Sequence, residues 1–579
     1  MITIKVNLVN ENFTENYLSN LLAARGVTDI KRYLEPDSSC LNSPTLLNNI
    51  ENGSLLLGEV LNKENSHILI IVDADVDGFT SGAIMYLYIK QLNPQQRISY
   101  ILHEHKEHGL QDHIENIINS NIHYDLVILP DSSSNDYEYH ETLKEHNMPC
   151  LILDHHEIDE GQLISDNAVV INNQLSPDYP NKDLTGAGVA WQFCRYMDTH
   201  DWEGNSASLI DLAALGICGD MGSILNLENR YIMLEGFSNI KNYFLKSAIE
   251  KQAYSMNNEI TPISVAFYIV PMMNAMIRMG TMEEKERLFL GLIDGHRKVP
   301  CNKRGAKGTM EEVAIESLRE CTNAKAKQNR ITDQMVGELE VKIFKYDLLE
   351  NKILFVRLED EEYPQEVTGL VAMKLAAKYK RPTIIARLND EGFDRGSGRG
   401  VNQSELTDFK SFLNNSGYVE WAQGHANAFG VSIPDANLHA FHEYANAALK
   451  DINFNEGAYD VNFIRDADAP DLEPLILELA KQPDIWGQNN PEALIYVPNI
   501  YLNDCEYKVI GSNKDTVRFE KNGVTFIKFH ANDLIRELDN CNEIKISVVG
   551  KPNINSWMGQ QTAQLFIEDW EVEDNLLSF

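Results

Sequence analysis

Short runs of branched apolar residues alternate with helical patterns over the first 220 residues of the chain. The first clear run, Ile68–Val72, is followed by acids at alternate positions, Asp73, Asp75 and Asp77, and then by a helical pattern. A continuous apolar run bounded by turn residues predicts a parallel strand that is buried on both faces. Open sheets of this kind bind ligands beyond the carboxyl ends of their strands. We therefore expect a site directly after Val72.

Three further apolar segments end in acids or histidines. They are Tyr124–Leu129 before Asp131, Pro149–Leu153 before Asp154, His155 and His156, and Leu209–Cys218 before Asp220. A solvated acidic turn is the ordinary alternative for any one segment, because Asp and Gly are common turn residues. Four such endings in one region of alternating strands and helices favour a site instead.

The chemistry of the expected site is that of a hard divalent cation. On an extended backbone, three acids at alternate positions leave the same face. Clustered carboxylates stay ionised in a partly dry pocket only when positive charge lies between them. Many oxygens with one imidazole suit Mn²⁺ or Mg²⁺, and there are enough acids for two ions about 3.5–4 Å apart. The expected ligands are Asp75, Asp77, Asp131, His155 and Asp220. His156 is then free to face the substrate, and Asp154 orients the two histidines.

Length and composition indicate a large soluble protein. A chain of 579 residues with an apolar fraction of 43% predicts three or four globular domains. We expect no membrane span and no signal peptide. The eight cysteines are scattered singly, which predicts reduced thiols and a cytoplasmic location.

The net charge of −36 excludes a general nucleic-acid coat. A polyanion must instead be bound through metal ions or a local basic surface. Basic residues gather in Arg297–Lys298, Lys303–Lys307 and Lys325–Arg330. Contact with a nucleic-acid backbone and a merely solvated loop are equally good interpretations of these segments.

The rest of the pattern predicts an α/β protein of four parts. Residues 1–235 form the domain with the parallel sheet and an N-terminal extension, and residues 236–335 a helical connector. Strands, among them Lys342–Lys345 and Lys352–Val356, then return in a second α/β domain over 336–454, where Arg395–Gly400 is expected to be a flexible loop. Short β runs over 455–579 predict a small barrel such as an OB-fold.

These motifs resemble a known family. Asp73–Gly78, Asp131, Asp154–His156 and Asp220 resemble the four motifs of the DHH phosphoesterases, and their order is most similar to the RecJ single-strand-specific 5′→3′ DNA exonucleases. Residues 184–190 and 271–279 resemble further family segments, and Trp421–Gly430 resembles the signature of the DHHA1 substrate-binding domain. The resemblance implies the same five metal ligands, with Asp73 as a further one, and a phosphate contact from His156. It also implies substrate binding by Asn274, Arg278, Ser397, Arg399, Gly424 and His425.

The chain departs from the family pattern at several positions. Gln423 replaces a glycine of the DHHA1 signature, and Met272 stands where the family carries an arginine. Three histidines, His103, His105 and His108, occupy a segment that usually holds another arginine. A solvated loop, metal ligands and substitutes for the missing cations all remain open for these histidines.

The expected function is therefore metal-dependent 5′→3′ hydrolysis of single-stranded DNA by a monomer. A single-strand-binding protein or another replication or repair protein is the expected type of partner. Two alternatives remain: a phosphodiesterase acting on short oligonucleotides or cyclic dinucleotides, and a non-catalytic DNA-binding scaffold.

Overall fold

The computed structural model describes residues 4–574 except 106, 107, 160, 201, 307, 360–362, 402, 455, 456, 504, 505, 540, 542, 543 and 558. Lys307 of the basic segments thus lies outside the described residues. The chain divides into two compact units. Unit A comprises residues 29–327 and 484–491, and unit B comprises residues 1–28, 328–483 and 492–579. Each unit is described by itself.

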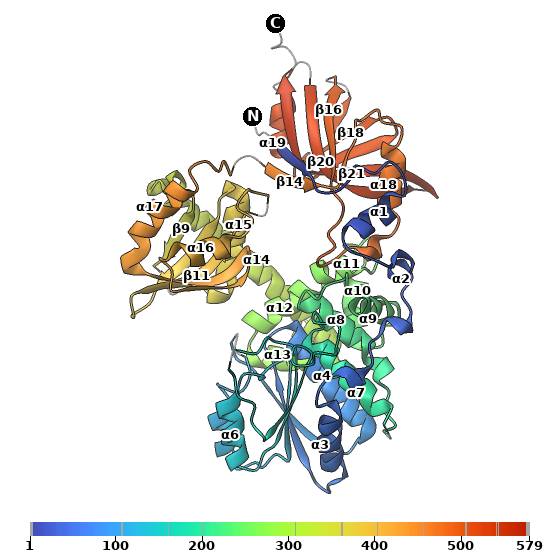
Figure 1. The fold of residues 1–579 in the computed structure, drawn as a ribbon, viewed down its shortest axis with the longest axis vertical. Helices are drawn as coiled ribbons and strands as arrows, with labels where there is room; N and C mark the ends of the chain where they lie inside the picture. The colour runs from blue at the N-terminus through green and yellow to red at the C-terminus, as the bar shows by residue number, and fades with distance from the viewer. Residues whose placement is uncertain are drawn as a thin grey trace. The chain divides into compact units, whose positions relative to one another are not determined.

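A five-stranded parallel sheet forms the centre of unit A (Figure 1). Its order is β3 (Arg97–Leu102), β2 (His67–Val72), β4 (Leu126–Pro130), β5 (Cys150–Asp154) and β6 (Ala168–Asn172). The strands β2, β4 and β5 lie where the apolar runs predict them, and β6 was not expected. Every residue of β2, β4 and β5 is buried, as expected for the inner strands of a parallel sheet.

Helices cover both faces of this sheet. α3 (Ile50–Asn62), α4 (Val76–Leu92) and α7 (Gly186–Asp198) share a core with one face, and α5 (Ile114–Asn119) and α6 (Tyr137–Glu145) with the other. Because β2, β4 and β5 are parallel, their carboxyl ends lie at one edge of the sheet, where the acids follow.

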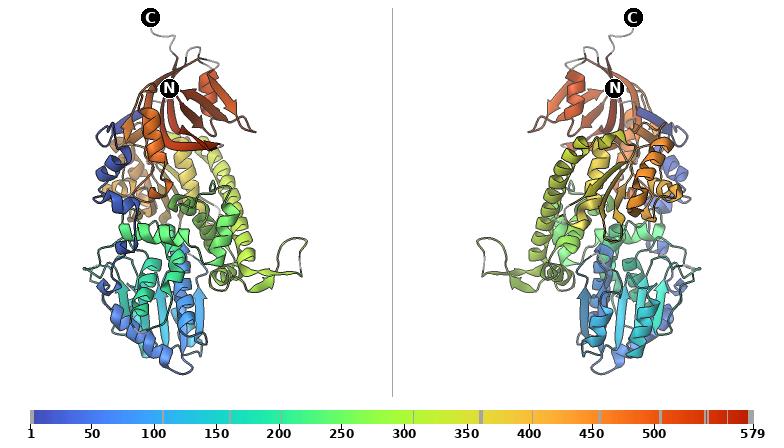
Figure 2. Two further views of the ribbon diagram at one scale, coloured as in Figure 1. Left: turned by 90° about the vertical axis from the view of Figure 1, so that its right-hand side faces the viewer. Right: turned by 90° about the vertical axis from the view of Figure 1, so that its left-hand side faces the viewer.

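The remainder of unit A is mainly helical. Its helices are α2 (Ile30–Leu34), α8 (Ile210–Gly219), α9 (Leu227–Ser238), α10 (Tyr243–Gln252), α11 (Pro262–Tyr268), α12 (Val270–Met279) and α13 (Met282–Ile293). A hairpin of β7 (Lys298–Pro300) and β8 (Met310–Glu312) follows and projects from the helices around it (Figure 2). The apolar stretch before Asp220 is thus a helix, α8.

The helix α14 (Val313–Lys345) begins in unit A and ends in unit B. The predicted strand Lys342–Lys345 is wrong, because these residues form the last turn of α14. The buried side chains of Met335, Leu339 and Ile343 recur every four residues, which is helical spacing.

One apolar segment of unit A has the length and composition of a membrane span. Residues 262–279 are long and apolar enough to cross a membrane by length and composition. The segment is divided between α11 and α12, however, and half of it is buried inside the protein. Its apolar character is therefore accounted for by packing within unit A.

The first sheet of unit B has five strands in the order β12 (Trp421–His425), β13 (Ala428–Pro434), β11 (Phe393–Arg399), β10 (Thr383–Leu388) and β9 (Leu354–Leu358). Its helices are α15 (Thr368–Tyr379), α16 (Phe409–Ser416) and α17 (Leu438–Ala448). The predicted flexible loop Arg395–Gly400 is wrong, since most of it belongs to β11. A side chain at Gly396 would clash with the carbonyl of Ile385 on β10. Close strand packing, rather than flexibility, therefore explains this glycine.

The second sheet of unit B has seven strands, and six of them match the predicted β runs. Its order is β15 (Phe463–Ile464), β16 (Ile495–Leu502), β20 (Ile544–Trp557), β21 (Gln560–Asp574), β19 (Val524–Lys528), β18 (Thr516–Lys521) and β17 (Tyr507–Ile510). The helices α1 (Tyr17–Ala24), α18 (Leu472–Ala480) and α19 (Asn532–Asp539) belong to the same unit. The N-terminal strand β1 (Ile4–Leu8), which pairs in parallel with β14 (Gly457–Val461), was not predicted.

Candidate metal centre

The three acids that follow β2 lie at a strand-to-helix junction. Asp75 is the N-cap of α4 and its side chain accepts a hydrogen bond from the Gly78 amide at 3.0 Å. The expectation that all three acids leave one extended backbone is wrong, because Asp77 already lies in the first turn of α4. The N-cap bond favours this early helix start. As a result Asp73 and Asp77 belong to different groups of possible metal ligands.

Asp77 is held by the N-terminus of α7. Its two carboxylate oxygens accept hydrogen bonds from the Gly186 amide at 2.7 Å, the Thr185 hydroxyl at 2.9 Å and the Ala187 amide at 3.1 Å. A helix N-terminus offers unpaired amides and positive potential, so it binds a carboxylate well. The segment Leu184–Ala190 therefore fixes the orientation of this acid.

Asp131 follows β4 with a backbone φ of 70°, in the left-handed region. Its amide donates to the carbonyl of Leu153 at 2.8 Å, which extends the pairing of β4 with β5. The carboxylate lies against Gly186, where an added Cβ would be 2.5 Å from the Cβ of Asp131. Glycine at position 186 is thus required for Asp131 to occupy this place.

Asp154 is the last residue of β5 and organises the two histidines that follow. Its Oδ1 accepts hydrogen bonds from the amide of His155 at 2.7 Å and from Nδ1 of His156 at 2.8 Å. Although burial opposes ionisation, the hydrogen bonds from His156 and Ser134 keep the pKa of Asp154 well below its ordinary value. The same bond to Asp154 raises the pKa of His156 to about 9, so its half-exposed ring is positively charged at neutral pH.

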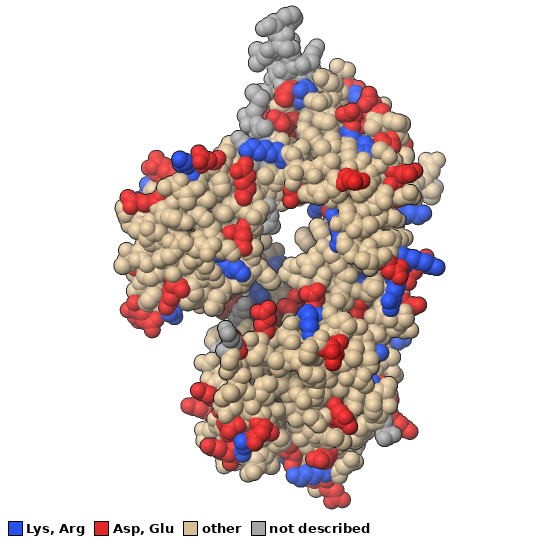
Figure 3. Space-filling model, in the orientation of Figure 1, with Lys and Arg blue, Asp and Glu red and all other residues tan. Residues whose placement is uncertain are grey.

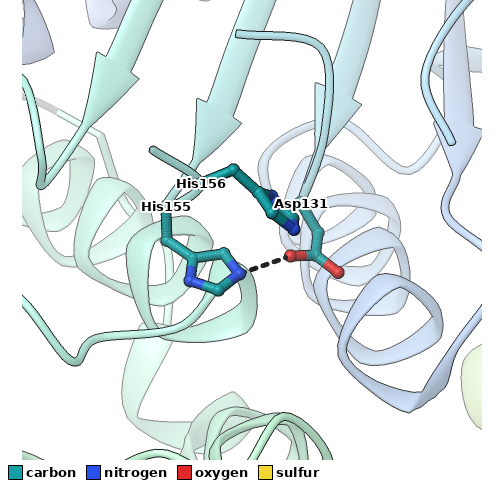
Figure 4. Close-up of side chains that lie close together, drawn as sticks. All are labelled: Asp131, His155 and His156. Carbon is teal, nitrogen blue, oxygen red and sulfur yellow. Dashed lines mark ion pairs between the residues drawn. The ribbon is translucent and has the colours of Figure 1, made fainter. Parts of the chain in front are cut away.

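The imidazole of His155 lies among three carboxylates. Its Nε2 is 3.2 Å from Oδ1 of Asp131, 3.6 Å from Oδ2 of Asp220 and 3.9 Å from Oδ2 of Asp77. Figure 4 shows both histidines beside Asp131. Three groups of possible ligand atoms, each within 4.8 Å, lie here: Asp73 with Asp75 and Asp131, Asp77 with His155 and Asp220, and Asp131 with His155 and His156. The structure thus brings all five expected ligands, and Asp73, together.

The electrostatics of this cluster favour a bound cation. Burial raises the pKa of Asp131 well above its ordinary value, and the neighbouring carboxylates of Asp77, Asp75 and Asp73 raise it further. Burial, and then the carboxylates of Asp77 and Asp75, raise the pKa of Asp220 to about 7. Burial lowers the pKa of His155, which keeps the ring neutral, as a metal ligand must be.

Two buried oxygens of the cluster, Oδ1 of Asp73 and Oδ1 of Asp131, accept no hydrogen bond from the described residues. A buried carboxylate oxygen without a donor is costly unless a cation contacts it. The donor set of five carboxylates and one imidazole fits Mn²⁺ or Mg²⁺.

The three histidines of the departing segment have different surroundings. Nδ1 of His108 lies 2.6 Å from Oδ2 of Asp73 and so contacts the cluster directly. His103 is buried, and its Nδ1 is 3.0 Å from Nε2 of His113. His105 is exposed. The sequence alone did not decide the role of His108, because its spacing does not distinguish it from His105.

The expected substrate residues Asn274 and Arg278 lie one turn apart on α12, which packs against α4. Oδ1 of Asn274 and Nε of Arg278 are buried atoms without a hydrogen-bond partner among the described residues. Met272 on the same helix is buried in the core of unit A.

The other expected substrate residues lie in unit B. Strand register pairs Arg399 with Ala428 and Ala428 with His425, so these three residues form one row across β11, β13 and β12. Ser397 is two residues before Arg399, on the same face, and its hydroxyl is 3.1 Å from that of Thr368 at the start of α15. Gly424, beside His425, has a φ of 127°.

A separate group away from this cluster, formed by Cys301, Glu311 and Glu316, also has metal-ligand spacing. The guanidinium of Arg319 is ion-paired with both glutamates. Positive charge is thus already present, and this group offers no comparable metal site.

Comparison with known proteins gives concordant results. Residues 67–217 match the model of the DHH family, N-terminal domain, and residues 466–569 match that of the RecJ OB domain. The putative SPbeta prophage-derived single-strand DNA-specific exonuclease YorK of Bacillus subtilis is 36% identical, over 98% of each chain. The single-stranded-DNA-specific exonuclease RecJ of Haemophilus influenzae is 24% identical over 95% of each chain.

Among solved structures, RecJ from Thermus thermophilus in complex with Mn²⁺ superimposes with a TM-score of 0.71 at 19% identity. The match covers 98% of this chain and 79% of that one, and at this identity it supports the fold.

Proposed function

The chain belongs to the RecJ family of single-strand-DNA-specific exonucleases, and from this premise we propose that it hydrolyses phosphodiester bonds of single-stranded DNA with Mn²⁺ or Mg²⁺. The single observation that carries the proposal is the convergence of His155 with Asp77, Asp131 and Asp220 within 3.9 Å. A scaffold has no need for mutually repelling buried carboxylates.

We propose two metal ions. Asp73, Asp75 and Asp131 would hold one, and Asp77, His155 and Asp220 the other, with Asp131 next to both groups. Bound there, the ions would lower the pKa of a water molecule and neutralise charge on the scissile phosphate.

The chain's own residues orient the metal ligands and stabilise the charge that develops on the phosphate. The amides of α7 fix Asp77, and Asp154 fixes the ring of His156. The positively charged, half-exposed His156 is suited to donate a hydrogen bond to a non-bridging phosphate oxygen as negative charge develops there. Attack of water on phosphorus then breaks the bond to the leaving 3′ oxygen, in the 5′→3′ direction.

We further propose that Asn274 and Arg278 bind the substrate strand. The unpaired Nε–H of Arg278 would donate to a phosphate or sugar oxygen, and the unpaired Oδ1 of Asn274 would accept a hydrogen bond from an amino or hydroxyl group of the strand. In unit B the row containing Arg399 and His425, next to Ser397 and Gly424, would bind a phosphate of the same strand.

The seven-stranded sheet that contains the RecJ OB domain match favours a long strand as substrate over a short oligonucleotide. We propose that the protein acts as a cytoplasmic monomer and that a single-strand-binding protein is a partner.

The test is a Mn²⁺-dependent digestion assay. Single-stranded DNA, duplex DNA and RNA are labelled at either the 5′ or the 3′ end and incubated with the wild-type chain and with Asp131→Ala. We expect 5′ label to be released first from single-stranded DNA alone, and no release by the variant. Preferential digestion of short oligonucleotides or cyclic dinucleotides, or equal rates for both chains, would contradict the proposal.

A further inference from the structure

An apolar pocket of about 210 Å³ lies in unit A at the C-terminal end of α8, the helix that Asp220 follows. Its lining comes from the C-terminal end of α8, from α11 and from the segment at Gly487, and it includes Met221, Gly222 and Phe267. Met221 directly follows the expected metal ligand Asp220. An apolar cavity of about 150 Å³ accommodates a benzene ring, so this pocket has room for a planar base ring.

Two large apolar side chains at this pocket are turned to solvent. Phe267 is 70% exposed and Met221 is 56% exposed. Exposed apolar side chains that gather at one place usually mark a binding surface, whereas single ones need no explanation. In the proposed reaction, the substrate strand is the molecule that binds next to Asp220, so it is the one expected to cover Phe267 and Met221.

The backbone at Met221 supports a binding role. The Gly222 amide donates to the carbonyl of Ile217 at 2.8 Å, as in the Schellman motif that ends many helices. The preceding position of that motif is left-handed and usually glycine, yet here it is Met221 with a φ of 58°. Met221 therefore carries a side chain at a backbone position where glycine would be less strained. Backbone strain of this kind is common at functional sites.

From these observations we propose that the pocket binds one base of the DNA strand, stacked on Phe267 and flanked by Met221. The inference rests on the proposed function and extends it to a base subsite. Every nucleobase has a flat apolar face, so stacking would hold the strand without reading its sequence. The base and the scissile phosphate belong to the same strand, which accounts for a pocket next to a metal ligand.

The test pairs variants of the pocket with abasic DNA. Five single-stranded DNA substrates, each with a single abasic nucleotide at a different one of the first five positions, are compared with intact DNA. Each is tested with wild type, Phe267→Ala and Phe267→Trp. Tyr254→Ala is the control, because Tyr254 is 92% exposed in the same unit but does not line the pocket. KM and kcat are measured with Mn²⁺, and DNA binding by fluorescence anisotropy.

We expect one abasic position to raise the KM of wild type about 5- to 150-fold, the range for one stacked base. Phe267→Ala should raise the KM for intact DNA by a similar factor and show no further loss at that abasic position. Phe267→Trp should restore binding. Equal abasic penalties in wild type and Phe267→Ala would overturn the inference.

Met221→Gly separates binding from folding. It removes left-handed strain, so we expect a higher melting temperature together with a higher KM for intact DNA. An unchanged KM would contradict the role of Met221. Failure of wild type to hydrolyse single-stranded DNA contradicts the proposed function instead, and the anisotropy measurement with abasic DNA still decides on the pocket.

Discussion

Nδ1 of His108 lies 2.6 Å from Oδ2 of Asp73, although the helix α4 and the strand β3 separate the two residues along the chain. The bond fixes one oxygen of Asp73 and leaves Oδ1, which has no partner among the described residues, for a cation. We therefore expect His108 to orient the proposed ligand Asp73 rather than to replace a phosphate-binding arginine.

His108→Ala should lower Mn²⁺ affinity or nuclease activity about 10- to 100-fold, as is typical when a residue that orients a metal ligand is lost. Mn²⁺ titrations of the digestion rate measure the effect. His105→Ala is the matched control, since His105 belongs to the same segment and is exposed. Equal behaviour of the two variants would show that the contact with Asp73 has no role in metal binding.

Asp131→Asn tests the carboxylate that lies nearest to His155. We expect hydrolysis to fall below about 1% of wild type, because the ion proposed for Asp73, Asp75 and Asp131 loses a charged ligand and the other ion loses a neighbouring negative charge. Without metal the variant should melt at a higher temperature than wild type, because it removes one of several mutually repelling buried carboxylates. Activity assays and thermal melts in a chelator check the two parts, and loss of activity with a lower melting temperature would indicate misfolding instead.

Mn²⁺ itself should stabilise the folded chain. At a free concentration of 100 times Kd, the expected gain in unfolding free energy is about 2.7 kcal/mol per site. The gain should be lost in Asp131→Asn and kept in Glu316→Gln, since Glu316 is already paired with Arg319. Denaturant unfolding with and without Mn²⁺ measures it. If the gain disappears in Glu316→Gln, the metal binds at the group of Cys301, Glu311 and Glu316 instead.

Sequence patterns were sufficient for the parallel sheet and for the acids and the histidine that come together at its edge. The strands before Asp131 and Asp154 are continuous apolar runs, and parallel pairing brings their ends together whatever the intervening loops do. The glycine and amide contacts at the N-terminus of α7 depend on how close two backbones come, which no periodicity encodes.

The errors have equally local causes. Lys342–Lys345 places two apolar residues between two lysines, and four positions are too few to distinguish a strand from a helix. Arg395–Gly400 is rich in glycine, but Gly396 admits the neighbouring strand β10 and Gly398 admits the ring of Phe429 on β13. His108 and Met221 carry no sequence signal at all, because their roles arise from contacts between distant segments.

The β7–β8 hairpin carries Lys303 and Arg304 between its strands. Both side chains are exposed, and neither forms an ion pair with another described residue. Acidic side chains are spread over the face of the molecule shown in Figure 3, so unpaired cations are valuable for holding a polyanion. We expect Lys303→Glu with Arg304→Glu to weaken binding of single-stranded DNA and to reduce the salt dependence of log K by about 1.4, or about 0.7 per lost phosphate contact.

The control for this pair of substitutions is Lys450→Glu with Lys481→Glu. It changes the net charge equally at two exposed positions in unit B. Anisotropy at several salt concentrations distinguishes the two. If both double variants lower the slope alike, the effect is one of overall charge, and the hairpin makes no specific contact.

Gly186→Ala tests the close approach on which the centre depends. The added methyl group would lie 2.5 Å from the Cβ of Asp131, so either the carboxylate or the start of α7 must move. Because the same turn donates its amide to Asp77, a shift displaces ligands of both proposed ions. We expect activity to fall at least 100-fold, since misplacement by about 1 Å can cost that much.

Gly337→Ala provides the comparison for Gly186→Ala. Gly337 is an exposed position inside α14 with no atom within 4 Å of an added Cβ, so alanine should stabilise the helix by up to about 1 kcal/mol and leave activity intact. Rates of digestion and Mn²⁺-induced stabilisation are measured for both variants. Full activity in Gly186→Ala would mean that Asp131 and α7 can separate without loss of the metals, and the geometric argument for the centre would fail.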